Sequence, residues 1–257
     1  MSVFHEPSRT SCHWSSRYPH RDAGHGSGSP DPAGGHSSVI AAASGQIFWW
    51  SPRRWCPRQR GHLIVLKDIT PSPLAQSFAR QWEKDPRHVE VVLQQSRRIV
   101  KMDRGVLITE THHGFICANA GVDQSNIEGE EVVAVLPPDP DASARAIRQA
   151  LRERLGFDVA VIISDTFGRP WRDGLVNIAI GLSGIEAIKD YTGQLDAQGY
   201  ELRVTALAIA DELAAAAELV MNKLDNVPVA VIRGYDYPHG EGSLAQLLRA
   251  AERDLFR

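Results

Sequence analysis

The spacing of apolar residues after about residue 62 predicts alternating helices and strands. Residues 72–82 and 86–95 show the spacing of amphipathic helices. Residues 105–111 and 114–119 read as two antiparallel strands that are joined by a tight His-His-Gly turn. The first part of this region is therefore predicted to be a pair of helices followed by a β-hairpin.

The second half of the chain alternates longer helices with short, continuously apolar strands. Helices are predicted at residues 137–156, 208–224 and 241–253, and strands at 158–164 and 228–233. Strands without polar alternation are typical of a sheet that is covered on both faces. We therefore expect a mixed α/β (α+β) fold, in which mixed sheets are flanked by helices.

The first 61 residues differ in composition from the rest of the chain. Up to residue 62 the chain contains four of its six Trp, two of its three Cys and no Lys. It also contains runs rich in Gly, Ser and Pro, and it lacks the clear periodicity of the later segments. We therefore expect residues 1–61 to stand apart from a domain that covers residues 62–257.

Charge and cysteine content exclude several function classes. The net charge is -3, and no basic cluster follows residue 62, so nucleic acid is not expected as a partner. No apolar run reaches the roughly 18 residues of a membrane span, and the first residues lack the order of a signal peptide. The three scattered cysteines give neither a metal-binding spacing nor an even disulfide framework. We expect a cytoplasmic protein without membrane contact.

The first group of candidate site residues follows the second hairpin strand, in the string NAGVDQSN. Asp123 and Asn126 place a carboxylate and an amide on one turn. Such oxygen donors suit Mg²⁺ or Mn²⁺ and substrates that carry phosphate. The alternative is an Asx turn, in which these side chains cap their own backbone.

The second group follows the buried strand, in the string SDTFGRPWRDG at residues 164–174. Asp165 and Thr166 are expected at the carboxyl end of that strand, where α/β proteins usually bind ligands, and they could hold a divalent ion there. Arg169 and Arg172 add planar donors suited to an anionic substrate group. The alternative is a turn that ends the strand and carries solvated arginines.

Several long strings occur in order in the second region: NAGVDQSN, LPPDPDASA, ISDTFGRPWRDG, DAQGYELRVTALAIADELAAAAELVMNKL and PVAVIRGYDY. Through them, residues 62–257 resemble the coenzyme F420-0:L-glutamate ligase family, also called the F420:γ-glutamyl ligase family. The resemblance implies a mixed α/β fold and a homodimer with intertwined subunits. It also implies an enzyme of F420 biosynthesis that adds L-glutamate through a γ-linkage to coenzyme F420-0.

The resemblance further implies a mechanism and a set of site residues. GTP would phosphorylate the terminal carboxylate of the coenzyme, and the glutamate amine would attack the acyl phosphate. Asp123, Asp165 and Thr166 would be metal ligands, and Asn126 would contact GTP. The expected ion is Mg²⁺ or Mn²⁺, and K⁺ is a further candidate.

The first 61 residues depart from the family pattern. Family members carry apolar first strands and a loop of the form VVTQKVVSKAEG, whose Ser and Lys would contact phosphate, and this chain contains neither. Suppose that the reading frame is shifted, so that each new codon consists of the third base of one present codon and the first two bases of the next. Residues 46–61 can then be read as DILVVTQKVVSKAEG, and the Trp-Trp and Trp-Cys junctions force Val. We therefore hypothesise a shifted reading frame, which leaves the domain without its first strands. The alternative is a genuine disordered extension.

Two function classes follow from these observations. The first is the GTP- and metal-dependent ligase, and the second is a catalytically impaired relative that binds metal, coenzyme or a partner subunit. A metal-dependent phosphohydrolase would share the carboxylates but gives no reason for the long Ala-rich string. For the chain as written we expect poor solubility and weak or absent activity, because lost strands expose a sheet edge and the loop Lys is missing.

Overall fold

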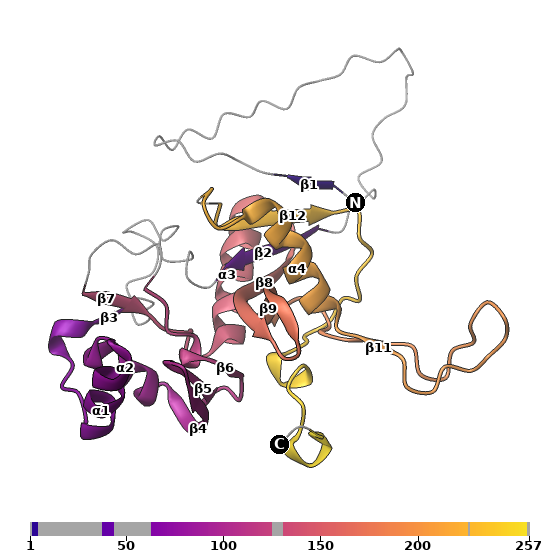
Figure 1. Ribbon diagram of the computed structural model, residues 1–257. Coiled ribbons are helices and arrows are strands. Elements are labelled where there is room, and N and C mark those ends of the chain that lie inside the picture. The colour runs from indigo at the N-terminus through magenta and orange to yellow at the C-terminus, as the bar shows by residue number, and fades with distance from the viewer. Residues whose placement is uncertain (1, 5–37, 44–62, 125–130, 226, 256–257) are drawn as a thin grey trace.

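The computed structural model describes residues 2–4, 38–43, 63–124, 131–225 and 227–255 (Figure 1). A five-stranded mixed sheet forms its centre. From one edge to the other, its strands are β1 (Ser2–Phe4), β12 (Val229–Arg233), β2 (Ser38–Ala43), β8 (Ala160–Arg169) and β9 (Arg172–Ser183). β2 and β8 are parallel, and the other neighbours are antiparallel. The prediction of a mixed α/β fold is confirmed.

One long helix covers each face of this sheet. Side chains of a strand alternate between the two faces, so Ile162 packs in the cluster that contains α4 (Ile209–Met221). Its neighbours Val161 and Ile163 pack in the cluster that contains α3 (Pro140–Leu155). All three side chains are fully buried, and the sheet therefore forms the middle layer of an α/β/α sandwich.

Two aspartates, one from each helix, form hydrogen bonds with the backbone of the same strand. Asp141, in the first turn of α3, accepts a hydrogen bond from the backbone N–H of Leu182 at 2.9 Å. Asp211, in the first turn of α4, accepts from the backbone N–H of Ala179 at 2.9 Å. Both donors lie in β9, close to its irregular pairing with β8. Each carboxylate satisfies a backbone donor and fixes the start of its helix against the sheet.

A group of smaller elements packs beside this sandwich (Figure 1). It consists of β3 (Leu63–Val65), α1 (Pro73–Trp82), α2 (Pro86–Gln94), β4 (Ser96–Asp103), β5 (Val106–Thr111), β6 (Ile116–Ala118) and β7 (Val132–Ala134). The two helices and β5 share a core that includes Phe78, Val91 and Leu107. Phe115 and Cys117, from the hairpin, pack in the same cluster as Val161 of β8. The predicted helix pair and hairpin are confirmed, and the hairpin borders the central sheet.

A long arm projects from the body between β10 (Lys189–Asp190) and β11 (Ala206–Leu207) (Figure 1). The two short strands pair with each other and with no other strand among the described residues. Large apolar side chains of the arm face solvent, and Val204 is 91% exposed. The arm therefore presents apolar surface that the body of the molecule does not cover.

The predicted closing helix at residues 241–253 is wrong. The segment contains only two short 3-10 helices, Leu244–Gln246 and Ala251–Arg253. The backbone N–H of Leu244 donates to the carboxylate of Asp141 at 3.0 Å, and the Gln246 side chain accepts from the backbone N–H of Ala187. These contacts with α3 and with the residues after β9 take the place of helical bonds, so tertiary packing overrides the helical spacing.

Two short segments from the first 61 residues lie in the central sheet, although the sequence predicts that they contribute no strand. β2 lies between β12 and β8, and Val39 is 1% exposed. β1 pairs with the other side of β12. An apolar Ser-Val-Ile-Ala-Ala-Ala run can thus supply the backbone partners that both neighbours need. The boundary at residue 62 stays a prediction. No helix in the described ranges is long and apolar enough to cross a membrane.

The close approach of α3 to β9 gives a test of this packing. A Cβ atom at Gly181 would lie 2.5 Å from the backbone carbonyl of Pro140. We expect Gly181→Ala to lower the free energy of unfolding by about 1–3 kcal/mol, the usual cost of overpacking. In the matched control Gly168→Ala the new methyl group meets no atom within 4 Å. Urea unfolding of both variants tests the packing, and equal stability of the two would contradict it.

Candidate active site

Asp165 and Thr166 lie inside β8, and not on a loop after it. The strand was predicted to end at Ser164, but it continues to Arg169 and turns directly into β9 at Arg172. Pairing with β9 extends along this whole segment. Both residues lie between the two irregular points of this pairing, at Ile163/Ser164 and Gly168/Arg169, so the pleat of the sheet decides where their side chains point.

The two side chains lie on opposite faces of the sheet. Asp165 lies on the face of Ile163 and Phe167, which packs toward α3 and the hairpin. Burial raises the pKa of the Cys117 thiol to about 12, and the negative charge of Asp165 adds to this shift, so the carboxylate lies close to Cys117. Thr166 lies on the other face, toward α4. The structure therefore does not bring these two predicted metal ligands together through their side chains.

Thr166 belongs to a chain of hydrogen bonds on the α4 face. Its hydroxyl donates to the side-chain oxygen of Asn177, on β9, at 2.7 Å. The Asn177 amide donates to the carboxylate of Glu218, on α4, at 2.6 Å. The ammonium group of Lys223 donates to the Thr166 hydroxyl. Asn177 is 2% exposed, so the middle of this chain is buried.

Asp123 follows the hairpin after the short 3-10 helix Asn119–Gly121. Its backbone pairs with Ala134 of β7 through hydrogen bonds of 3.0 and 2.7 Å. The residue is exposed, and its charge acts on His88 of α2. Burial and Lys84 lower the pKa of His88, and Asp123 partly opposes them. The Asx-turn alternative for this motif, and Asn126 itself, lie outside the described residues.

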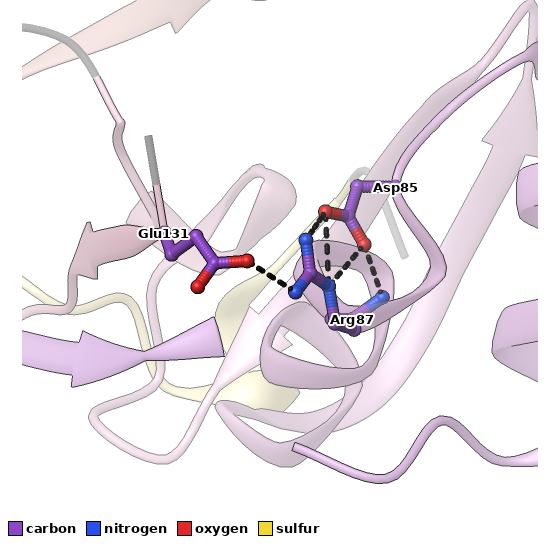
Figure 2. Close-up of polar contacts among 3 residues, drawn as sticks. All are labelled: Asp85, Arg87 and Glu131. Atoms are coloured by element: carbon purple, nitrogen blue, oxygen red, sulfur yellow. Dashed lines mark hydrogen bonds and ion pairs between the residues drawn. The ribbon is translucent and has the colours of Figure 1, made fainter. Parts of the chain in front are cut away.

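An ion-pair network holds Glu131, the first described residue after position 130. Figure 2 shows Arg87 between Asp85 and Glu131, with nitrogen–oxygen distances of 2.8 and 2.9 Å. The Arg87 hydrogen bonds hold the pKa of the Asp85 carboxyl below its usual value. The backbone carbonyl of Glu131 accepts from Leu66 at 2.7 Å. Asp123 and Glu131, on either side of residues 124–130, therefore both bond to other parts of the described chain.

The end of the β8–β9 hairpin carries the two candidate arginines. Arg169 donates to the backbone carbonyl of Asp173, and its Nε is buried with no hydrogen-bond partner in the described part of the chain. Arg172 lies opposite it and is exposed. Trp171, between them, is 80% exposed and has a φ of 60°. Arg169 thus braces the turn, while Arg172 is available for an anionic group.

The carboxylates fit a metal ion bound together with phosphate better than they fit a closed protein site. The described residues contain no group of three or more His, Cys, Asp or Glu side chains that could hold a metal ion. Mg²⁺ is commonly bound by one or two carboxylates and by substrate phosphates, and Asp123 and Asp165 could supply this number. The Thr166 hydroxyl does not fit, because it already accepts from an ammonium group, which would repel a divalent ion.

Comparison with known proteins shows the same family that the sequence motifs resemble. The family model described as F420-0:Gamma-glutamyl ligase matches residues 56–234. The chain belongs to this family. Three relatives that carry the name Coenzyme F420:L-glutamate ligase are also similar. The protein of Methanothermobacter thermautotrophicus is 45% identical over 203 residues, which cover 78% of this chain and 80% of the relative. The Methanocaldococcus jannaschii protein is 47% identical over 198 residues, which cover 77% and 79%. The Methanopyrus kandleri protein is 45% identical over 205 residues, which cover 78% and 81%.

The sequence interpretation of this F420-0:γ-glutamyl ligase family member did not include Asn177 and Lys223. Asn177 lies in an apolar strand, and a lone amide there gives no local sign of its partners. Lys223 reaches a residue 57 positions earlier in the chain, which no local pattern can indicate. One sign of this hydrogen-bond chain was present in the sequence, the acidic residue Glu218 next to a run of alanines in α4.

The ion pair of Arg87 predicts a pH-dependent stability. The folded pKa of Asp85 lies below its unfolded value, so the pair stabilises the fold above the unfolded pKa of about 3.9 and stops doing so as pH falls through the folded pKa. We expect Arg87→Met to be less stable than the unchanged protein at neutral pH, and this difference to shrink toward pH 2.

Urea unfolding at both pH values measures the Arg87 difference. The matched control is Arg145→Met, which removes an exposed ion pair with Asp139 at 3.7 Å and should change little at either pH. A difference for Arg87→Met that is the same at both pH values would contradict the assignment.

Proposed function

We propose that this chain is a coenzyme F420-0:L-glutamate ligase of F420 biosynthesis, which acts in the cytoplasm. The observation that carries the proposal is the 45–47% identity to ligases of that name over nearly four-fifths of the chain. Family membership supports the proposal, and the candidate carboxylates Asp123 and Asp165 suit its chemistry.

Forming an amide from a carboxylate requires an activated acyl group. The terminal carboxylate oxygen of the coenzyme attacks the γ-phosphorus of GTP, and GDP leaves. The amine of L-glutamate then attacks the acyl carbon, inorganic phosphate leaves, and the amine loses a proton. Both steps place negative charge on oxygen atoms, so a fixed set of positive charges and donors lowers their barriers.

Each candidate residue has a role in this scheme. Asp123 and Asp165 would hold Mg²⁺ or Mn²⁺, which when bound neutralises charge on the phosphates; K⁺ is a further candidate ion. Asn126 would contact GTP, from a segment whose flanking residues are fixed. Arg172 would orient an anionic group of the coenzyme or of glutamate, while Arg169 holds the turn that presents it.

The projecting arm supports a homodimer with intertwined subunits. Its apolar side chains include Leu195, Tyr200 and Val204, which are 68%, 63% and 91% exposed. Apolar surface gathered on a projecting segment is typical of an interaction site. A second copy of the chain would cover these side chains.

A second candidate function is a catalytically impaired relative that binds metal, coenzyme or a partner subunit. The observation in its favour is the sequence before residue 62, which lacks the family loop with its Ser and Lys. β2 supplies a strand to the sheet, but the sequence after it contains no Lys before residue 67. A chain with this head would keep Asp123 and Asp165 without the loop that completes the site.

The test is incorporation of labelled L-glutamate into F420-0 with GTP and Mn²⁺ or Mg²⁺. We compare this chain with a version in which residues 46–61 read DILVVTQKVVSKAEG. We expect turnover in the restored protein and weak or absent turnover in the chain as written. Turnover in neither protein would favour the binding-only relative.

Variants of the restored protein test the carboxylates. We expect Asp123→Asn and Asp165→Asn each to lower kcat about 100-fold or more, because one electrostatic contact at a reacting group commonly contributes that much. The control is Asp103→Asn, at the solvent-facing end of the β4–β5 hairpin. Full activity of both site variants would rule out their assigned role.

A further inference from the structure

Four polar side chains on the α4 face of the sheet form one directed chain of hydrogen bonds. It runs from Lys223 to Thr166, from Thr166 to Asn177, and from Asn177 to Glu218. A lysine ammonium only donates, and an ionised carboxylate only accepts. The two ends therefore fix the direction of every bond between them, and the hydroxyl proton of Thr166 must point toward Asn177.

The turn after α4 brings Lys223 to this position. Asn222 ends the helix with a φ of 51° and a ψ of 173°, a positive-φ conformation that residues other than Gly rarely adopt. Its backbone N–H donates to the carbonyl of Glu218 at 3.0 Å, and its side chain donates to Asp225 at 2.9 Å. The helix thus ends at this point, and the next residue, Lys223, contacts Thr166 of β8.

We propose that the Lys223 ammonium supplies the positive charge at Thr166, so that Thr166 does not bind the metal ion in this chain. The inference rests on the proposed function, because it concerns the metal expected there. Two observations support it. The hydroxyl lone pair that faces outward accepts from Lys223, and the neighbouring Asp165 lies on the opposite face of β8. Metal binding is thereby confined to the Asp165 face.

The charge balance of the chain supports the same assignment. Glu218 is half-buried, and it accepts from the amide of the buried Asn177. Lys223 is the cation at the other end of the same hydrogen-bond chain, and Thr166 and Asn177 lie between it and Glu218. Removal of the ammonium would free the outward lone pair of the Thr166 hydroxyl, and the Glu218 carboxylate lies one side chain further along the same hydrogen-bond chain. Both are oxygen donors of the kind that a hard divalent ion prefers.

The experiment measures binding of Mn²⁺ alone to the full chain, by the loss of the free-ion signal in electron paramagnetic resonance. In the unchanged background we expect Thr166→Val to alter the Mn²⁺ dissociation constant by less than about twofold. Asp165→Asn should weaken binding about tenfold or more. Lys223→Met should add a further Mn²⁺ site, which the double variant Lys223→Met/Thr166→Val loses. Lys223→Arg keeps the charge and should bind Mn²⁺ like the unchanged chain.

The outcomes separate this inference from the proposed function. Weakening by Thr166→Val as large as that by Asp165→Asn, with Lys223 present, would overturn the inference. So would an unchanged Mn²⁺ stoichiometry in a Lys223→Met variant whose thermal unfolding matches that of the unchanged chain. If Asp165→Asn binds Mn²⁺ as tightly as the unchanged chain, the carboxylate site of the proposed function is wrong. The role of Lys223 would still be supported if Thr166→Val leaves the Mn²⁺ dissociation constant unchanged and Lys223→Met gains a site.

Discussion

The pairing of β8 with β2 on one side and β9 on the other fixes the geometry of the candidate site. Because β8 runs without a break from Ala160 to Arg169, its side chains alternate between two helices that pack on opposite faces. Asp165 and Thr166 are neighbours in sequence but belong to different environments. Asp165 lies on the face that packs against the hairpin, and Thr166 lies on the face that packs against α4. The sheet thus divides the expected metal ligands between its two faces.

The same pairing explains why a sequence that departs from its family at the start can still complete this sheet. The strands β12 and β8 require backbone partners between them, and β2 supplies them with a short apolar run. Backbone pairing sets few demands on side chains, whereas phosphate binding sets many. The position in the sheet is therefore filled, while the loop expected to grip GTP is absent from the sequence.

Local chemistry made much of the fold predictable. Ser72 and Asp85 cap α1 and α2, each is followed by proline, and Gly156 ends α3 in the left-handed region, so these helices could be expected from short patterns. The helix predicted at residues 241–253 does not form, because Asp141 and Ala187 bond to that segment from distant parts of the chain. The contact of Lys223 with Thr166 is equally non-local. Motifs indicated the residues of the site, but only the tertiary structure could show which side of the sheet each one faces.

The most direct measurement of this account is a crystal structure of the chain grown with Mn²⁺, examined by the anomalous scattering of manganese. The division of ligands between the two faces of β8 predicts an anomalous peak beside the Asp165 carboxylate. It also predicts the Lys223 ammonium in contact with Thr166 on the other face. A manganese peak bound to the Thr166 hydroxyl, with the Lys223 side chain turned away, would contradict it.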